Sequence, residues 1–278
     1  MIVFPNCKIN LGLNILRKRS DGYHDLETIF YPLPLRDVLE IIEHKQPERT
    51  VPIPFTTSGL SIQGDTSSNI CVKAYRLLKK RFPALPFVQM HLHKLIPSGA
   101  GLGGGSADAA FALQALNKKF RLGLSHAELI DAASELGSDC PFFIINKPCF
   151  ASGTGNLLEE IDLDLCGYKF VVVNPGIHID TGRAFLNIVS SAAEISIKEI
   201  IKRPVQRWKD ELKNDFEKII FKDHRPIVDI KDELYRQGAI YASMSGSGST
   251  VYGIFEKERS LQLSFPPHYF MKELICQQ

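Results

Sequence analysis

The chain has 278 residues, 44% of them hydrophobic and 23% charged, which is typical of a folded globular protein and excludes pervasive disorder. With 33 basic and 31 acidic residues the formal charge is only +2, so no basic surplus points to nucleic acid as a partner. The length predicts two domains, because a single domain is usually about 150 residues long.

The cysteines and the apolar segments favour a cytoplasmic protein. None of the six cysteines belongs to a C-x-x-C pair, so neither a zinc ribbon nor a disulfide framework is indicated, and reduced thiols are expected. Lys8 and Asn10 interrupt the stretch that would form the apolar part of a signal peptide. The longest apolar runs, such as residues 170–173, are far shorter than the roughly 20 residues of a membrane-spanning helix. We therefore expect no membrane partner and no resident metal.

The first 97 residues predict a β-rich segment with one helix. Asp21-Gly22 is typical of a tight turn and separates two runs of strand-forming residues, so the chain is expected to open on a hairpin. A helix is expected over 67–82, where Ile70, Ala74 and Leu77 recur at helical spacing. The predicted strands of this part are 7–16, 26–33, 38–42, 55–62 and 88–92.

After the strand that ends near Pro97, a glycine-rich loop leads into an alanine-rich helix over 107–116. In the next helix, Ser125 and Glu128 form a capping box, and Gly137 is expected at its end in the left-handed conformation. The remaining chain mixes both element types, with predicted helices 181–188, 206–221 and 227–237 and predicted strands 168–173, 240–244 and 250–255. The pattern predicts an α+β protein with domains 1–155 and 156–278.

The glycine-rich loop is the most informative segment for function. Five of the nine residues from Ser98 to Ser106 are glycine, which lets backbone N–H groups approach an anion without side-chain interference. The N-terminus of the following helix adds free N–H donors and the positive end of the helix dipole. The alternative is a turn that only packs the helix closely on the strand, but five ordered glycines would cost too much entropy for that purpose alone. The segment therefore predicts a polyphosphate site.

Two better-known phosphate motifs do not account for this loop. No Gly-Lys-Ser/Thr follows the glycines, which excludes a P-loop. Gly99, Gly101 and Gly104 do satisfy G-x-G-x-x-G between a strand and a helix. A dinucleotide fold also needs an acidic residue about 20 positions further on, where residues 118–124 contain none. A nucleoside triphosphate is thus favoured over a nicotinamide cofactor.

Three segments together resemble the GHMP kinase superfamily. They are Pro5-x-x-Lys8-Ile-Asn10-Leu, the loop from Pro97 to Ala110, and Met244-Ser-Gly-Ser-Gly-Ser-Thr-Val-Tyr-Gly253. The resemblance implies an α+β GHMP kinase fold, with an N-terminal nucleotide-binding domain like domain 2 of ribosomal protein S5 and a C-terminal ferredoxin-like α/β-sandwich domain. It also implies a phosphotransferase that uses ATP and Mg²⁺ on a small-molecule alcohol, as a monomer or homodimer.

Within the superfamily, Lys8-Ile-Asn10-Leu, Asp21-Gly-Tyr23-His24 and the segment from Gly137 to Phe143 are similar to kinases of the non-mevalonate isoprenoid pathway. Those enzymes phosphorylate the 2-hydroxyl of a cytidine-diphosphate-linked methylerythritol. The resemblance implies Asp139 as catalytic base beside Lys8. The residues implied to hold the acceptor are Asn10, Tyr23, His24, Thr181 and Phe185. Those implied to contact ATP are Asn69, Lys94, Pro97, Ser98, Gly99, Ala100, Gly101, Leu102, Gly103, Gly104, Gly105, Ser106 and Ala107.

Several residues also allow a purely structural interpretation. Asp139 precedes Pro141 and could cap a short helix. His91 and His93 share one face of a strand, and a solvated face is favoured over a metal pair because no third ligand is apparent. At the level of function, the alternatives are another GHMP member, such as a homoserine or mevalonate kinase or a diphosphomevalonate decarboxylase, and a nucleotide-binding scaffold that has lost catalysis.

Overall fold

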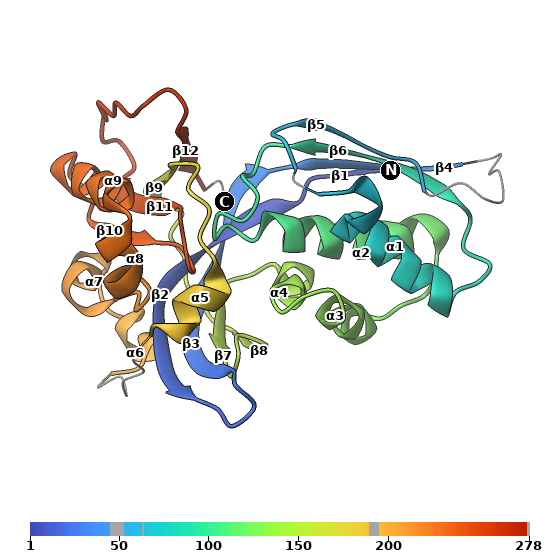
Figure 1. Cartoon of the computed structure of the whole chain (residues 1–278), viewed down its shortest axis with the longest axis horizontal. Helices are drawn as coiled ribbons and strands as arrows, with labels where there is room; N and C mark the ends of the chain where they lie inside the picture. Colours follow the sequence, from blue (N-terminus) through green and yellow to red (C-terminus); the bar gives the residue numbers. More distant parts are fainter. Residues whose placement is uncertain (45–52, 63, 189–194, 277–278) are drawn as a thin grey trace. The chain divides into compact units, whose positions relative to one another are not determined.

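The computed structural model describes residues 1–44, 53–62, 64–188 and 195–276, and its elements are labelled in Figure 1. The chain divides into two compact units that are built from interleaved segments rather than from two consecutive halves. The first unit comprises Met1–Cys7, Leu35–Ser98 and Gly103–Asn146, and the second comprises Lys8–Pro34, Gly99–Leu102 and Lys147–Gln278. The domain boundary expected after residue 155 stays a prediction.

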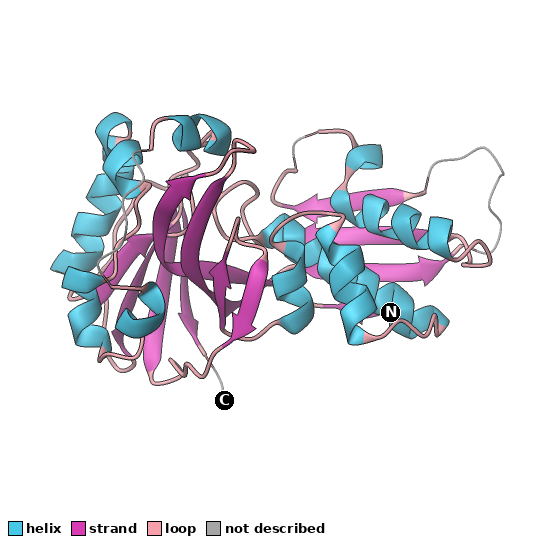
Figure 2. Cartoon of the chain, turned by 90° about the horizontal axis from the view of Figure 1, so that it is seen from below, coloured by secondary structure: helices cyan, strands magenta, loops and turns pink. Residues whose placement is uncertain are grey.

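The first unit is a four-stranded sheet with helices on one side (Figures 1 and 2). The strand order is β1-β4-β6-β5, and the pair β5–β6 is parallel whereas the other pairs are antiparallel. The strands are β1 (Ile2–Val3), β4 (Val38–Glu43), β5 (Phe55–Gly59) and β6 (Val88–Lys94). The helices are a 3₁₀ turn at Thr66–Ser68, α1 (Ile70–Arg81), α2 (Gly104–Phe120), α3 (His126–Ser134) and α4 (Cys140–Ile145).

Alternation along β6 separates the core of this unit from solvent. Val88, Met90 and Leu92 are buried, in agreement with the predicted half-buried strand. On the opposite face, His91 and His93 hydrogen-bond hydroxyl groups of the neighbouring strand β5. Among the residues that the structure describes, no group of three or more His, Cys, Asp or Glu side chains could hold a metal ion.

The second unit contains two further four-stranded sheets, ordered β2-β3-β7-β8 and β10-β11-β9-β12. The first consists of β2 (Asn6–Lys18), β3 (His24–Arg36), β7 (Cys149–Ser152) and β8 (Leu157–Glu160). The second consists of β9 (Tyr168–Asn174), β10 (Tyr241–Met244), β11 (Val251–Glu256) and β12 (Phe270–Ile275). The helices are α5 (Thr181–Leu186), α6 (Ile197–Ile200), α7 (Val205–Glu211), α8 (Glu217–Asp223) and α9 (Arg225–Arg236). A core that includes Val171, Phe216, Ile230 and Met244 joins these helices to the sheets.

Most expected elements are present, and two local predictions are wrong. The opening hairpin and the capping box of Ser125 and Glu128 are confirmed. Gly137 does not take a left-handed conformation, because α3 already ends at Ser134 and Glu135 follows it with right-handed dihedral angles. The strands β1, β7, β8 and β12 carry too little periodicity for the sequence to reveal them.

The second error concerns the single helix expected over 206–221. The structure divides it into α7 and α8, and the residues between them pair with β2 instead. Leu13 N–H donates to Lys213 O at 2.8 Å, and Asp215 N–H donates to Leu13 O at the same distance. Tertiary pairing therefore uses backbone groups that a continuous helix would need for its own hydrogen bonds.

Candidate active site

The glycine-rich loop adopts a conformation that only glycine allows at its central position. Gly101 has a φ of +79°, and a Cβ atom there would lie 2.1 Å from the carbonyl oxygen of Ser245. Gly103 precedes α2 in the left-handed conformation, and the helix begins at Gly104. The first turn of a helix leaves N–H groups without intrahelical acceptors, so α2 presents the donors that an anion requires.

Lys94, which is expected at ATP, lies against the start of α2 and is buried. Its ammonium group is 1% exposed and forms ion pairs with Asp37 and Asp108, the latter at 2.7 Å. A Cβ atom on Gly104 would lie 3.0 Å from Lys94 Nζ, so the lysine supports the start of α2. Burial alone would lower the pKa of Lys94, but the two carboxylates outweigh it and raise the pKa above its usual value.

In the second unit, β2 brings Lys8 and Asn10 to the other end of the loop. Lys8 N–H donates to Leu102 O at 2.9 Å, and its Nζ donates to Asn10 Oδ1 at 2.6 Å. The Lys8 ammonium also lies 4.7 Å from the ring centre of Phe30. The Asn10 amide donates to the hydroxyl of Thr28 at 3.1 Å. Both side chains are thus buried and fixed in orientation.

A second glycine-rich turn, residues 244–248, packs against both β2 and the loop. Ser245 Oγ donates to Gly101 O at 2.8 Å and accepts from Asn10 N–H at 3.2 Å. Tyr252 on β11 donates its hydroxyl to Asn10 O at 2.8 Å. One serine hydroxyl therefore connects the predicted phosphate loop with the strand that carries Lys8 and Asn10.

Asp139 stands at the start of α4 and does not act as a helix cap. Its backbone is right-handed and its side chain makes no capping hydrogen bond to the helix. The next residue, Cys140, hydrogen-bonds the hydroxyl of Ser106 in the first turn of α2. Burial raises the pKa of the Cys140 thiol to about 11, so it remains protonated. The N-termini of α2 and α4 are therefore adjacent within the first unit.

Of the residues expected at the cytosine end of the acceptor, His24 and Phe185 pack against each other, whereas Tyr23 is exposed. The rings of His24 and Phe185 stack with their centres 5.2 Å apart, and Phe216 packs edge-on against Phe185 at 4.9 Å. Thr181 Oγ1 lies 2.7 Å from Ser247 Oγ, which ties α5 to the second glycine turn. The Tyr23 side chain, in contrast, is 68% exposed.

Sequence reasoning missed three residues that hold the site together, namely Asn214, Phe216 and Glu217. The feature of the sequence that could have revealed them is the polar pair Asn214-Asp215, which interrupts a pattern that otherwise predicts a helix. Asn69, expected at ATP, accepts a hydrogen bond from Cys71 N–H as the N-cap of α1. Whether it also contacts nucleotide stays a prediction.

Comparison with known proteins identifies the family of this chain. Sequence models described as "GHMP kinases N terminal domain" and "GHMP kinases C terminal" match residues 69–147 and 196–263. A 4-diphosphocytidyl-2-C-methyl-D-erythritol kinase of Bacteroides thetaiotaomicron is 54% identical over 261 residues, which is 94% of each chain. A protein of the same name from Cytophaga hutchinsonii is 50% identical over 92% of each chain.

Solved structures show the same fold. The crystal structure of a 4-(cytidine 5'-diphospho)-2C-methyl-D-erythritol kinase has a TM-score of 0.78 at 28% identity and covers 92% of this chain and 91% of its own. The mevalonate kinase of Methanococcus jannaschii has a TM-score of 0.70 at 15% identity over 100% of this chain and 98% of its own, a likeness of fold alone. The chain therefore belongs to the GHMP kinase superfamily and, within it, to the family of 4-diphosphocytidyl-2-C-methyl-D-erythritol kinases.

Proposed function

We propose that this kinase transfers the γ-phosphoryl group of ATP to the 2-hydroxyl of 4-diphosphocytidyl-2-C-methyl-D-erythritol. Family membership supports the substrate, since relatives of that name are up to 54% identical over 94% of the chain. The glycine loop supports the donor, because the first turn of α2 has N–H groups without intrahelical acceptors and Gly105 has no atom within 4 Å of its Cβ position. The stacked rings of His24 and Phe185 suit the flat cytosine of the acceptor.

In this mechanism Asp139 accepts the proton of the attacking hydroxyl. The observation that carries this assignment is the hydrogen bond between Ser106 and Cys140, since it places the start of α4 beside the helix that follows the phosphate loop. Asp139 immediately precedes α4, and its side chain makes no capping hydrogen bond to that helix, so capping does not explain an aspartate at this position. A positioned base typically contributes about 100- to 10,000-fold to the rate.

Lys8 and Asn10 act on the reacting oxygens. The Lys8 ammonium favours the developing alkoxide and the charge on the phosphoryl group, since phosphoryl transfer depends on positioning and electrostatics. Asn10 orients the acceptor and is itself held by Lys8 and Thr28. The proposal requires Lys8 and Asp139 to act on the same phosphoryl group, so their substitutions should be strongly non-additive.

Mg²⁺ is expected to arrive with ATP. Magnesium uses one or two protein oxygens together with phosphate oxygens and waters, so a site that lacks a dedicated cluster of ligands fits it. The hydroxyl of Ser106 is an oxygen donor of the right kind in the first turn of α2. The ion would neutralise charge on the β- and γ-phosphates.

We further infer a cytoplasmic location. All six cysteines are free thiols, which agrees with a reducing compartment. Among the described residues, no helix is long and apolar enough to cross a membrane.

The test is an assay of ADP release by the purified protein with Mg-ATP and 4-diphosphocytidyl-2-C-methyl-D-erythritol, with ³¹P NMR of the product. Homoserine and mevalonate serve as acceptors that lack the cytosine. Turnover with the cytidine-linked acceptor alone is expected. ATP binding without turnover on any acceptor would instead favour the nucleotide-binding scaffold, and turnover with mevalonate or homoserine would move the chain to another GHMP activity.

A further inference from the structure

Four consecutive residues in the break between α7 and α8 contact separate parts of the second unit. Asn214, Asp215, Phe216 and Glu217 are all at most 9% exposed, although three of them are polar. Asp215 Oδ2 accepts from Ile15 N–H at 2.8 Å, which fixes the segment on β2. Buried polar side chains almost always have hydrogen-bond partners. The partners of these residues therefore show which parts of the unit the segment connects.

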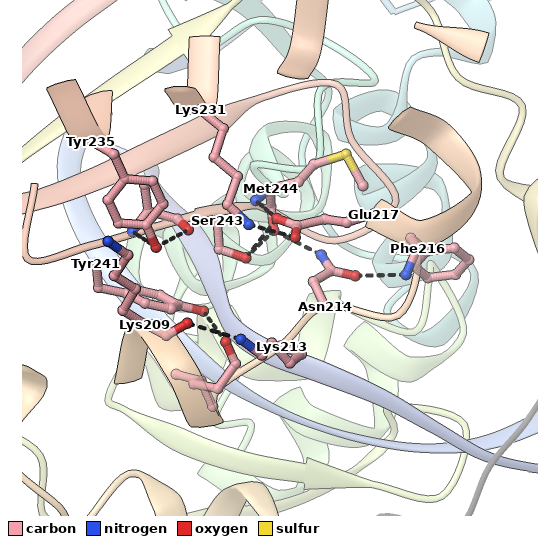
Figure 3. Close-up of polar contacts among 12 residues, drawn as sticks. Lys209, Lys213, Asn214, Phe216, Glu217, Lys231, Tyr235, Tyr241, Ser243 and Met244 are labelled. Carbon is pink, nitrogen blue, oxygen red and sulfur yellow. Dashed lines mark hydrogen bonds and ion pairs between the residues drawn. The ribbon is translucent and has the colours of Figure 1, made fainter. Parts of the chain in front are cut away.

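Asn214 binds the second glycine turn through both hydrogens of its amide, and Figure 3 shows its bond to Met244. Its Nδ2 donates to Met244 O at 2.7 Å and to Gly246 O at 2.8 Å. Its Oδ1 accepts from Phe216 N–H at 3.0 Å. Two carbonyl oxygens on one side and an N–H group on the other allow only one orientation of the amide. The residue therefore holds two points of the turn from a fixed position.

Glu217 holds the same turn from the first residue of α8 (Figure 3). Its Oε1 accepts from Met244 N–H at 2.8 Å and from Ser243 Oγ at 3.1 Å, and its Oε2 pairs with Lys231 at 2.6 Å. The carboxylate charge is thus compensated by Lys231. Asn214 and Glu217 together bind the N–H and the C=O of Met244, the last residue of β10.

The 244–248 turn, which Asn214 and Glu217 hold, contacts both the glycine-rich loop and Asn10. Between Met244 and Gly246 stands Ser245, whose hydroxyl bonds Gly101 O in the phosphate loop and accepts from Asn10 N–H. A Cβ atom on Gly246 would lie 3.3 Å from Asn10 Oδ1, so the turn also packs against the Asn10 amide. Displacing the turn would therefore move the surroundings of the phosphate loop and of Asn10 together.

We propose that Asn214, supported by Glu217, is a positioning residue of this kinase that fixes the 244–248 turn against Gly101 and Asn10. The inference rests on the proposed function for its kinetic consequence, but the ordering of the turn is a property of the protein alone. A merely structural role would lower the fraction of folded enzyme, whereas a positioning role changes the affinity of the folded enzyme for its substrates.

The experiment compares Asn214→Leu with Tyr235→Phe. Leucine has the same number and branching of side-chain heavy atoms as asparagine, and it leaves the carbonyls of Met244 and Gly246 without their donor and Phe216 N–H without its acceptor. Tyr235 is the matched control, because its hydroxyl also makes two bonds to β10, both with Ala242 and at 3.1 Å. Removing that hydroxyl costs comparable stability without touching the turn.

Two measurements separate the outcomes. In Asn214→Leu, kinetics well below the unfolding temperature are expected to show a KM for ATP and for the acceptor raised about tenfold, since displaced contacts loosen both ligands. Hydrogen–deuterium exchange of the peptide covering 244–250 is expected to speed up about tenfold, with no such change in Tyr235→Phe. If Asn214→Leu does not accumulate, Asn214→Ser, which keeps one donor, takes its place.

Equal KM values and equal exchange of the 244–250 peptide in the Asn214 variant and the Tyr235→Phe control would overturn the positioning role. A wild-type protein without turnover on the cytidine-linked acceptor contradicts the proposed function instead, and the exchange measurement still decides whether Asn214 orders the turn. The two failures are therefore distinguishable.

Discussion

The ammonium group of Lys94 lies 2.7 Å from Asp108 Oδ2, in a part of the first unit where both side chains are almost completely buried. The same ammonium also pairs with Asp37, so two carboxylates share one cation next to the start of α2. Asp108 Oδ1 has no hydrogen-bond partner among the described residues. Burial, reinforced by Asp37 and opposed by Lys94, raises the pKa of Asp108 to about 7.

This arrangement predicts a stability that depends on pH below neutrality. The folded protein binds a proton at Asp108 that the unfolded chain has released above its usual pKa of 3.8. The free energy of unfolding should therefore fall as the pH rises from about 4 to about 7. Asp108→Asn, which keeps an acceptor for Lys94, removes this contribution, so its stability relative to wild type should increase over the same interval. Denaturant unfolding at pH 5 and pH 8 measures the difference.

The control for this prediction is Asp131→Asn, because Asp131 is an exposed carboxylate on α3. Its stability relative to wild type should change little between the two pH values. Identical pH dependence in Asp108→Asn and wild type would show that Asp108 is ionised throughout the interval.

Asp139→Asn is expected to lower kcat about 100- to 10,000-fold with little effect on stability. The amide cannot accept the proton of the acceptor hydroxyl, and α4 loses no cap because the Asp139 side chain makes no capping bond. Steady-state kinetics and thermal unfolding measure the two effects. Ser125→Ala provides the opposite case, since Ser125 does cap α3. It should cost about 1 kcal/mol of stability and leave kcat unchanged. An active Asp139→Asn enzyme would mean that another group serves as the base.

Gly101→Ala should abolish most of the activity because the new methyl group meets the Ser245 carbonyl oxygen, 2.1 Å from the Cβ position. Either the phosphate loop or the 244–248 turn must move, and kcat/KM is expected to drop about 100-fold. Gly123→Ala is the matched control, since Gly123 has a φ of +78° and no atom within 4 Å of its Cβ position. Both variants share the cost of the left-handed conformation, and Gly101→Ala loses further stability from the contact with the Ser245 carbonyl. Equal activities in the two would contradict the importance of this contact.

Phe185→Leu is expected to raise KM for the cytidine-linked acceptor about threefold to tenfold while KM for ATP stays constant. Leucine keeps apolar contact with Phe216 but removes the ring that stacks on His24. Phe265→Leu tests whether loss of any stacked ring has the same result, because Phe265 stacks on Tyr269 at 6.3 Å. A parallel rise of both KM values in Phe185→Leu would place Phe185 outside specific recognition of the acceptor.

Local patterns were sufficient for the elements whose cause lies within a few residues. The capping box at Ser125 and Glu128 begins α3 as predicted, because both partners belong to the same turn. The change from the glycine-rich loop to α2 was likewise predictable, since the glycines interrupt regular structure and the alanine-rich segment after them favours a helix. The resemblance to GHMP kinases followed from segments of this local kind, and the relatives confirm it.

Where the sequence failed, a distant partner outweighed the local preference. Residues 206–221 have a helical pattern, but β2 takes the backbone of Lys213 and Asp215 and divides the helix. In the sequence, the family resemblance implies that Lys94 lies near ATP. Its ion pairs with the buried Asp37 and Asp108 become visible only in the fold. Neither outcome has a signal in neighbouring residues, because the competing partner is far away in the chain.

The sequence by itself thus determined the family, the glycine-rich loop before α2 and the capping box of α3, because these depend on short-range backbone preferences. Tertiary structure alone decided which side chains support that loop and the 244–248 turn. Buried hydrogen bonds such as those of Asn214 with Met244 and Gly246 exist only once distant strands and helices have packed and excluded water.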